Sequence, residues 1–206
     1  MRKLIWLLAA AITFVVVIAV VGFMFLKTRA NGFSARAQPS ALEEFAALTA
    51  LSMSLPAGVK DKRNPIANSS EVLAEARAHW ADHCAICHAN DGSGDNTMGR
   101  QMYPPSPDMR KERTRRLTDG ELFYIIKNGI RLSGMPAWGS GTDQDAEDSW
   151  KLVHFIRHLA ALSPGEIKDM EKLNPKSPDE LEEERQEEQF LKGQTPAEAP
   201  KQHHHH

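Results

Sequence analysis

The hydrophobic residues of this chain fall into one unbroken run near the start and several helically spaced groups after it. Residues 4–26 are almost entirely apolar, with basic residues on both sides. At about 1.5 Å per residue, such a helix crosses a hydrocarbon layer of about 30 Å. A cleavable signal peptide is the alternative, with a small-x-small site at residues 35–37, but its apolar region is usually only about 7–15 residues long. We therefore predict an uncleaved transmembrane anchor over residues 1–29.

Beyond this run, apolar residues recur at the spacing of amphipathic helices. Several of these segments begin with a capping box, in which Ser or Thr precedes Glu by three positions, as in Ser40 and Glu43 or Thr118 and Glu121. The pattern predicts helices over residues 41–53, 69–83, 118–128, 145–160, 164–173 and 178–192. The chain is therefore a helix-leaning protein with extensions at both ends.

Changes in charge and the positions of proline and glycine divide the chain into four parts. We predict an anchor, a spacer with a short helix, one folded domain and an acidic helical or disordered tail; these cover residues 1–29, 30–67, 68–162 and 163–206. The spacer helix could pack on the domain, lie on the membrane or serve only as an ordered linker. The formal net charge is only −2, and no strongly basic face is evident, so we predict no nucleic-acid partner.

The chemistry centres on a short motif with both cysteines of the chain. Cys84 and Cys87 are separated by two residues, and His88 follows at once. A disulfide would leave His88 unexplained, a zinc site needs four ligands, and a thioredoxin-like pair expects a strand before it. The remaining interpretation is haem c attachment, in which the thiols form thioethers with the vinyl groups and His88 is an axial iron ligand.

A second motif downstream offers a ligand for the other side of the iron. Met135 lies in a glycine-bounded loop between Gly134 and Gly139, with a proline beside it and Trp138 able to close the site. A thioether is a soft, neutral ligand that suits haem iron and raises its reduction potential. Rival methionines, which lie nearer His88, are Met98, Met102 and Met109. A bis-histidine site with His154 or His158 is a further alternative, although we interpret both as surface or interface histidines.

A proline-rich turn lies between these two motifs, at residues 103–107. Proline cannot continue a helix, so the turn is rigid. We predict that the carbonyl of Pro104 or Pro105 accepts the second ring N–H of His88, which would fix the tautomer and strengthen the ligand. A basic cluster follows the turn, and it could contact a haem propionate or an acidic partner; its members are Arg110, Lys111, Arg113, Arg115 and Arg116.

The order of these motifs resembles that of the class I monohaem cytochromes c. The resemblance rests on residues 84–88, the turn at 103–107, the loop at 134–138 and a closing helix at 150–159, and it covers about residues 68–162. It implies an all-α fold around one covalent haem, with crossing terminal helices. By the same resemblance, His88 and Met135 would be the axial ligands and the function would be one-electron transfer.

We therefore predict a membrane-tethered electron carrier of a respiratory-type chain rather than an enzyme. Haem c is attached on the outer side of bacterial inner membranes, which places the domain in the periplasm or its equivalent. Redox proteins would be the partners, but the sequence does not identify them or the oligomeric state. A fixed subunit of a larger oxidoreductase complex and a haem sensor or peroxidase with a labile Met135 are alternatives. Residues 203–206 are a histidine run, either a tag or a native tail.

Overall fold

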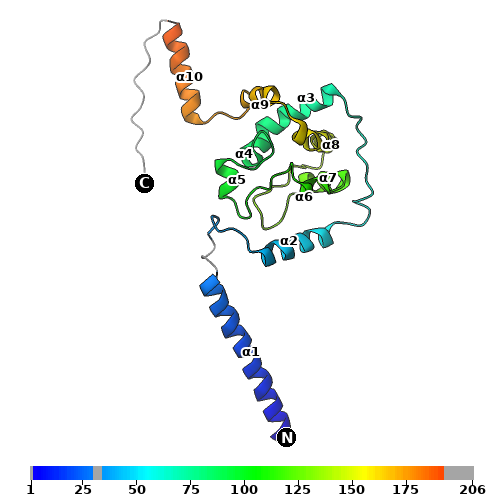
Figure 1. The fold of residues 1–206 in the computed structure, drawn as a ribbon, viewed down its shortest axis with the longest axis vertical. Coiled ribbons are helices and arrows are strands. Elements are labelled where there is room, and N and C mark those ends of the chain that lie inside the picture. Colours follow the sequence, from blue (N-terminus) through cyan, green and yellow to red (C-terminus); the bar gives the residue numbers. More distant parts are fainter. Residues whose placement is uncertain (1, 30–33, 193–206) are drawn as a thin grey trace.

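A computed structural model describes residues 2–29 and 34–192, and within these ranges it contains helices and no strands (Figure 1). The all-α prediction is confirmed. The helices are α1 (Arg2–Arg29), α2 (Ala41–Ser54), α3 (Ser70–His79), the π-helical turn η1 (Trp80–Cys84), α4 (Ala85–His88), α5 (Thr97–Gln101), α6 (Glu112–Arg115), α7 (Asp119–Asn128), α8 (Asp143–His158), the 3-10 turn η2 (Leu159–Ala161), α9 (Pro164–Glu171) and α10 (Pro178–Leu191).

The core forms where α3 and η1 pack against α8, with α7 on another side of α8. Trp80 and Phe155 are almost completely buried there, and their ring centroids lie 5.5 Å apart. Phe123 of α7 stacks on Trp150 of α8 with the centroids 4.1 Å apart. The predicted apolar faces of the first and last helices of the domain therefore meet, and they fix the helix that carries Cys84.

Replacing Phe155 with alanine should lower the free energy of unfolding by about 3–5 kcal/mol, because it leaves a cavity in a closely packed core. Phe190 is the matched control, since it lies on α10 and is 75% exposed, whereas Phe155 is 0% exposed. Denaturant unfolding followed by circular dichroism would measure both variants. Equal losses in Phe155→Ala and Phe190→Ala would contradict this description of the core.

Most predicted helices are present, with small differences at their ends. The segment predicted as one helix over residues 69–83 is α3 followed by η1, in which the hydrogen bonds shift to the π pattern before α4 continues to His88. The sequence patterns did not predict α5 and α6, which have only 5 and 4 residues and show no apolar periodicity. Helical periodicity needs a longer window than either provides.

The end of the predicted spacer packs on the domain. Val59 is 4% exposed, and the side-chain amide of Asn64 donates to the carbonyl of Trp150 at 2.8 Å. His154 contacts the carbonyl of Ile66 through Nε2, also at 2.8 Å. Residues 59–66 are called the strap; Asn64 and Ile66 of the strap are hydrogen-bonded to α8. The packed unit therefore begins before residue 68.

At the other end of the domain, α9 adds to the same core. Met170 is completely buried in the cluster that contains Trp80 and Phe155. Glu166 ties α9 to two other helices, since its Oε1 lies 3.4 Å from Arg77 of α3 and 3.2 Å from Nε2 of His158 on α8. The packed unit therefore extends past residue 162 into the predicted tail.

Glu166 gives this docking a dependence on pH. Hydrogen bonds from the backbone N–H and hydroxyl of Ser163, with a smaller contribution from His158, lower the pKa of Glu166 to about 2. A carboxyl whose pKa is lower in the folded state stabilises the fold above its unfolded pKa, near 4.3, and loses this contribution as the pH falls through its folded pKa. We expect Glu166→Gln to be less stable than the parent near neutral pH. The difference in free energy of unfolding should shrink between about pH 5 and about pH 2; a constant difference in thermal melts would contradict this.

The two terminal helices lie outside the packed unit. Helix α1 has the length and composition to span a membrane, with a mean hydropathy of 3.0 over the most apolar part of Arg2–Lys27. Helix α10 exposes most of Leu181, Phe190 and Leu191 and contributes no residue to the core. Parts of the predicted spacer and tail, including Gly193 and the histidines at 203–206, lie outside the described residues.

Candidate functional site

Cys84 ends η1, and Cys87 lies in α4 directly before His88, so all three residues belong to one short helical segment. Both thiols are free, with no disulfide between them. Burial raises the pKa of Cys84 to about 12, aided by the neighbouring Cys87, and burial also raises the pKa of Cys87. The structure therefore presents two free thiols beside one imidazole, the set of side chains that attachment of haem c needs.

His88 is held as a neutral imidazole. Burial lowers its pKa to about 4, and the neutral ring is the form that binds metals. Its ring lies 5.7 Å from that of Trp80, which in turn donates from Nε1 to the carbonyl of Ala89 at 3.0 Å. Trp80 thus braces the turn on its core side.

The Nδ1 atom of His88 is buried and has no hydrogen-bond partner within the described part of the chain. The predicted bond to the carbonyl of Pro104 or Pro105 is therefore not formed in this structure. Pro104 is exposed and Pro105 half-buried, and the next residue, Ser106, donates its N–H to the carbonyl of Gly99 at 3.0 Å. The roles of the two prolines stay predictions. A buried, neutral imidazole with two free thiols on the same turn nevertheless fits a covalently held haem.

A loop that follows the motif wraps around it. The N–H of Gly94 donates to the carbonyl of His88 at 2.8 Å, and the side-chain amide of Asn96 donates to the carbonyl of Ala85 at 2.8 Å. Asn96 also caps α5 by accepting from the N–H of Gly99. Sequence analysis missed the contribution of Asn96 to the site. Its position before Thr97 could have indicated an N-cap, but no local pattern indicates the longer-range bond to Ala85.

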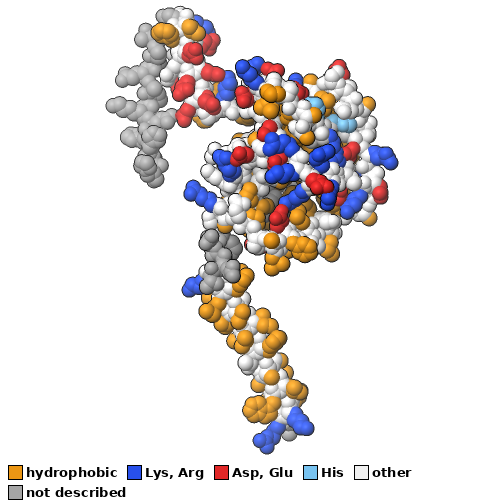
Figure 2. Space-filling model, viewed as in Figure 1, with side chains coloured by type: hydrophobic (Ala, Val, Ile, Leu, Met, Phe, Trp, Pro, Cys, Tyr) orange, Lys and Arg blue, Asp and Glu red, His pale blue; other side chains and the backbone are white. Residues whose placement is uncertain are grey.

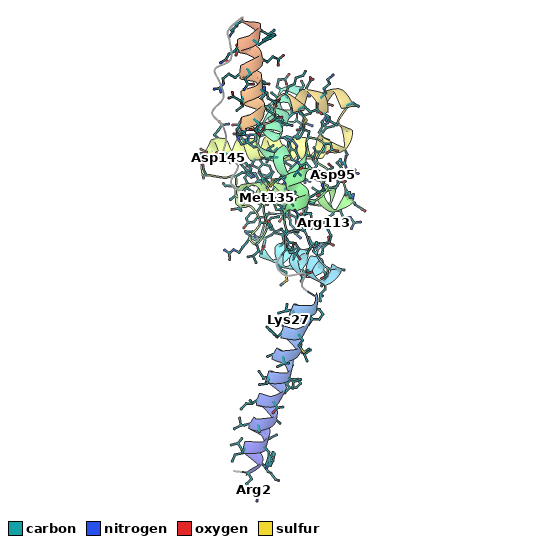
Figure 3. All side chains as sticks on the ribbon, turned by 90° about the vertical axis from the view of Figure 1, so that its left-hand side faces the viewer. Arg2, Lys27, Asp95, Arg113, Met135 and Asp145 are labelled. Atoms are coloured by element: carbon teal, nitrogen blue, oxygen red, sulfur yellow. The ribbon has the colours of Figure 1, made fainter. Side chains whose placement is uncertain are left out.

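Met135 lies in a hydrogen-bonded loop after α7 and is half-buried (Figure 3). Its carbonyl accepts from the N–H of Ile130 at 3.1 Å, and its N–H donates to Oγ of Ser133 at 3.1 Å. Gly129 precedes the loop with φ of +65°, and a Cβ at this position would lie 2.7 Å from the Met135 carbonyl. The loop can therefore close on the end of α7 only because residue 129 is glycine.

Trp138 connects this loop to the cysteine motif. Its backbone N–H donates to the carbonyl of Ile126 at 3.2 Å, which fixes the tryptophan at the end of α7. Its ring meets that of His83 edge-on, with the centroids 5.6 Å apart. Because His83 directly precedes Cys84, the two motifs predicted to form the site are in contact. His83 itself was not predicted as a site residue, since its helical spacing indicated only one more position on a helix face.

One rival methionine lies beside the loop. A Cβ added to Gly134 would lie 2.4 Å from the sulfur of Met102, so this thioether packs against the residue before Met135. Met98 is 49% exposed, and Met109 packs against the hydrophobic core. Met102 is therefore the rival that any ligand experiment must include.

The other candidate residues have structural partners. His154 and His158 contact Ile66 and Glu166, as described above, so both side chains are used to hold the strap and α9. Four members of the basic cluster form ion pairs within the described part of the chain: Arg110 with Asp91 and Asp108, Lys111 with Asp108, Arg113 with Glu44, and Arg116 with Glu112.

A comparison with known protein families matches the part of the chain that carries this site. The family described as cytochrome C oxidase, cbb3-type, subunit III matches residues 71–156, which span the cysteine motif, the methionine loop and most of α8. No curated protein matches the chain.

Proposed function

We propose that this protein carries single electrons between redox partners, since residues 71–156 are a class I-like cytochrome c domain with one covalently bound haem c. The observation that supports the proposal most strongly is the turn at residues 84–88, where two free thiols and a buried, neutral imidazole occur together. When bound, the haem supplies an iron that alternates between the ferrous and ferric states.

Each residue of the site has a separate role in this proposal. Cys84 and Cys87 would hold the haem through thioethers, and His88 and Met135 would ligate its iron. Trp80 and Trp138 would shield the site from water through their ring contacts with His88 and His83. Two protein ligands leave no open position on the iron, so the site favours electron transfer over substrate chemistry.

Helix α1 would anchor the domain to a bacterial inner membrane, with the domain on the periplasmic side. Its length and composition support a membrane span, and attachment of haem c supports the outer side. Tethering keeps the carrier at high effective concentration near membrane-bound partners.

A fixed subunit of a membrane oxidase is the second candidate, and the description of the matching family favours it. Gentle solubilisation distinguishes the two: recovery in a stoichiometric assembly would favour the subunit, and a free monomer would favour the carrier.

A redox titration of the purified protein tests electron transfer itself. We expect a reversible one-electron curve and no turnover with hydrogen peroxide. Peroxidase turnover by the intact protein would contradict the proposal and favour catalysis at an opened iron site.

A further inference from the structure

Helix α2 has two apolar sides, and only one of them faces the domain. At 3.6 residues per turn, Glu44, Leu48 and Leu51 share one side of the helix, and Leu48 and Leu51 are half-buried. On the other side, Leu42, Phe45 and Met53 are 74%, 68% and 81% exposed. These three residues are called the outer stripe below. Figure 2 shows hydrophobic side chains gathered along this edge of the domain.

Both carboxylates of α2 are engaged on the domain side or at the cap. Glu44 forms an ion pair with Arg113 at 2.5 Å, and Glu43 accepts from the hydroxyl of Tyr103 at 3.1 Å while closing the capping box with Ser40. These bonds hold α2 against the domain in one orientation about its own axis. They also leave the outer stripe without a charged side chain.

The hydroxyl within the outer side is satisfied by the helix itself. Thr49 lies between Phe45 and Met53, and its Oγ1 donates to the carbonyl of Phe45 at 2.8 Å. An unpaired hydroxyl donor would oppose burial of this side in an apolar medium. The hydroxyl of Thr49 is already bonded, so it does not have this effect.

The position of α2 identifies what covers the stripe. Figures 1 and 3, which differ by a quarter turn, both show α2 as the element of the domain nearest the C-terminal end of α1. Residues 30–40 join the two helices, and they span at most about 40 Å even when fully extended. Helix α2 therefore lies within about 40 Å of the C-terminal end of α1.

We propose that α2 is an interfacial helix whose outer stripe, Leu42, Phe45 and Met53, lies in the lipid surface beside the anchor. Such helices lie in the plane of the interface with their apolar face among the headgroups and upper acyl chains. Because Glu43 and Glu44 are bonded to the domain and the cap, insertion turns one fixed side of the domain toward the bilayer. This orientation rests on the membrane anchoring proposed for α1 and does not depend on electron transfer.

Photocrosslinking from the stripe tests this in the full-length, haem-loaded protein in phosphatidylcholine nanodiscs. With Phe45→p-benzoyl-phenylalanine, we expect lipid adducts in the mass spectrum of the peptide with residue 45. The control carries the same group at Leu173, an exposed residue that follows α9 in the sequence. Helix α9 lies on the opposite side of the domain from α2 (Figure 1). Lipid adducts at position 45 but not 173 support the proposal. Adducts to a second copy of the chain, or equal lipid labelling at both positions, overturn it.

A second measurement compares amide exchange in the same nanodiscs. In the variant Leu42→Gln, Phe45→Gln, Met53→Gln, we expect the amides of residues 41–54 to exchange about tenfold faster, because less apolar area is removed from water. A matched variant changes Leu181, Phe190 and Leu191 of α10 to glutamine and should leave this exchange unaltered. An unchanged visible spectrum would show that both variants retain the folded domain. Equal exchange in the stripe variant and the parent would overturn the proposal.

Discussion

Replacing Cys84 and Cys87 together with alanine should abolish covalent haem attachment, so that denaturing gels stained for haem show no band at the position of the protein. The physical reason is that the chain has only these two thiols, and no other side chain forms a thioether with a vinyl group. Each single replacement should leave at most one thioether and a smaller yield of haem-loaded protein.

The control for this experiment is Ile86→Val, between the two cysteines. Ile86 is 53% exposed, so the loss of one methylene should affect neither attachment nor stability measurably. Haem that stays covalently bound in the double alanine variant would contradict the assignment. Loss of haem in Ile86→Val would show that position 86 tolerates less change than the exposure of its side chain indicates.

Met135→Leu should open the second axial position while nearly conserving side-chain volume. We expect the reduced protein to bind carbon monoxide and the reduction potential to fall by on the order of a hundred millivolts or more, because a thioether ligand raises the potential of haem iron. Visible spectroscopy and a redox titration would measure the two effects.

Two further variants determine whether Met135 or another thioether is the ligand. Met102→Leu tests the rival that packs against Gly134, and Met98→Leu tests an exposed methionine elsewhere on the domain. We expect both to keep the spectrum of the parent, since Leu and Met are nearly equal in volume. A normal spectrum in Met135→Leu together with carbon monoxide binding in Met102→Leu would reassign the ligand to Met102.

The sequence was sufficient for the features that depend on local patterns. Capping boxes at Ser40 and Thr118 predicted helix starts that the structure confirms, because a cap is formed by residues three positions apart. The all-α class was likewise predicted, and the family match supports the interpretation of residues 84–88 as a haem c motif.

The sequence was insufficient where contacts join distant segments. Neither periodicity nor capping indicates that Trp138 meets His83, that Asn64 bonds the carbonyl of Trp150 or that Met170 completes the core. These contacts follow from the tertiary packing of the helices. The hydrogen bond from His88 to a proline carbonyl was predicted from the rigid turn at residues 103–107, and in the structure Nδ1 of His88 has no partner among the described residues.

The visible spectrum of the reduced protein, produced with the haem-attachment machinery and recorded before and after addition of carbon monoxide, tests the central claim most directly. We predict a low-spin spectrum that carbon monoxide leaves unchanged, because His88 and Met135 would occupy both axial positions. A large shift on addition of carbon monoxide would contradict simple electron transfer, since it would mean that the position assigned to Met135 opens readily.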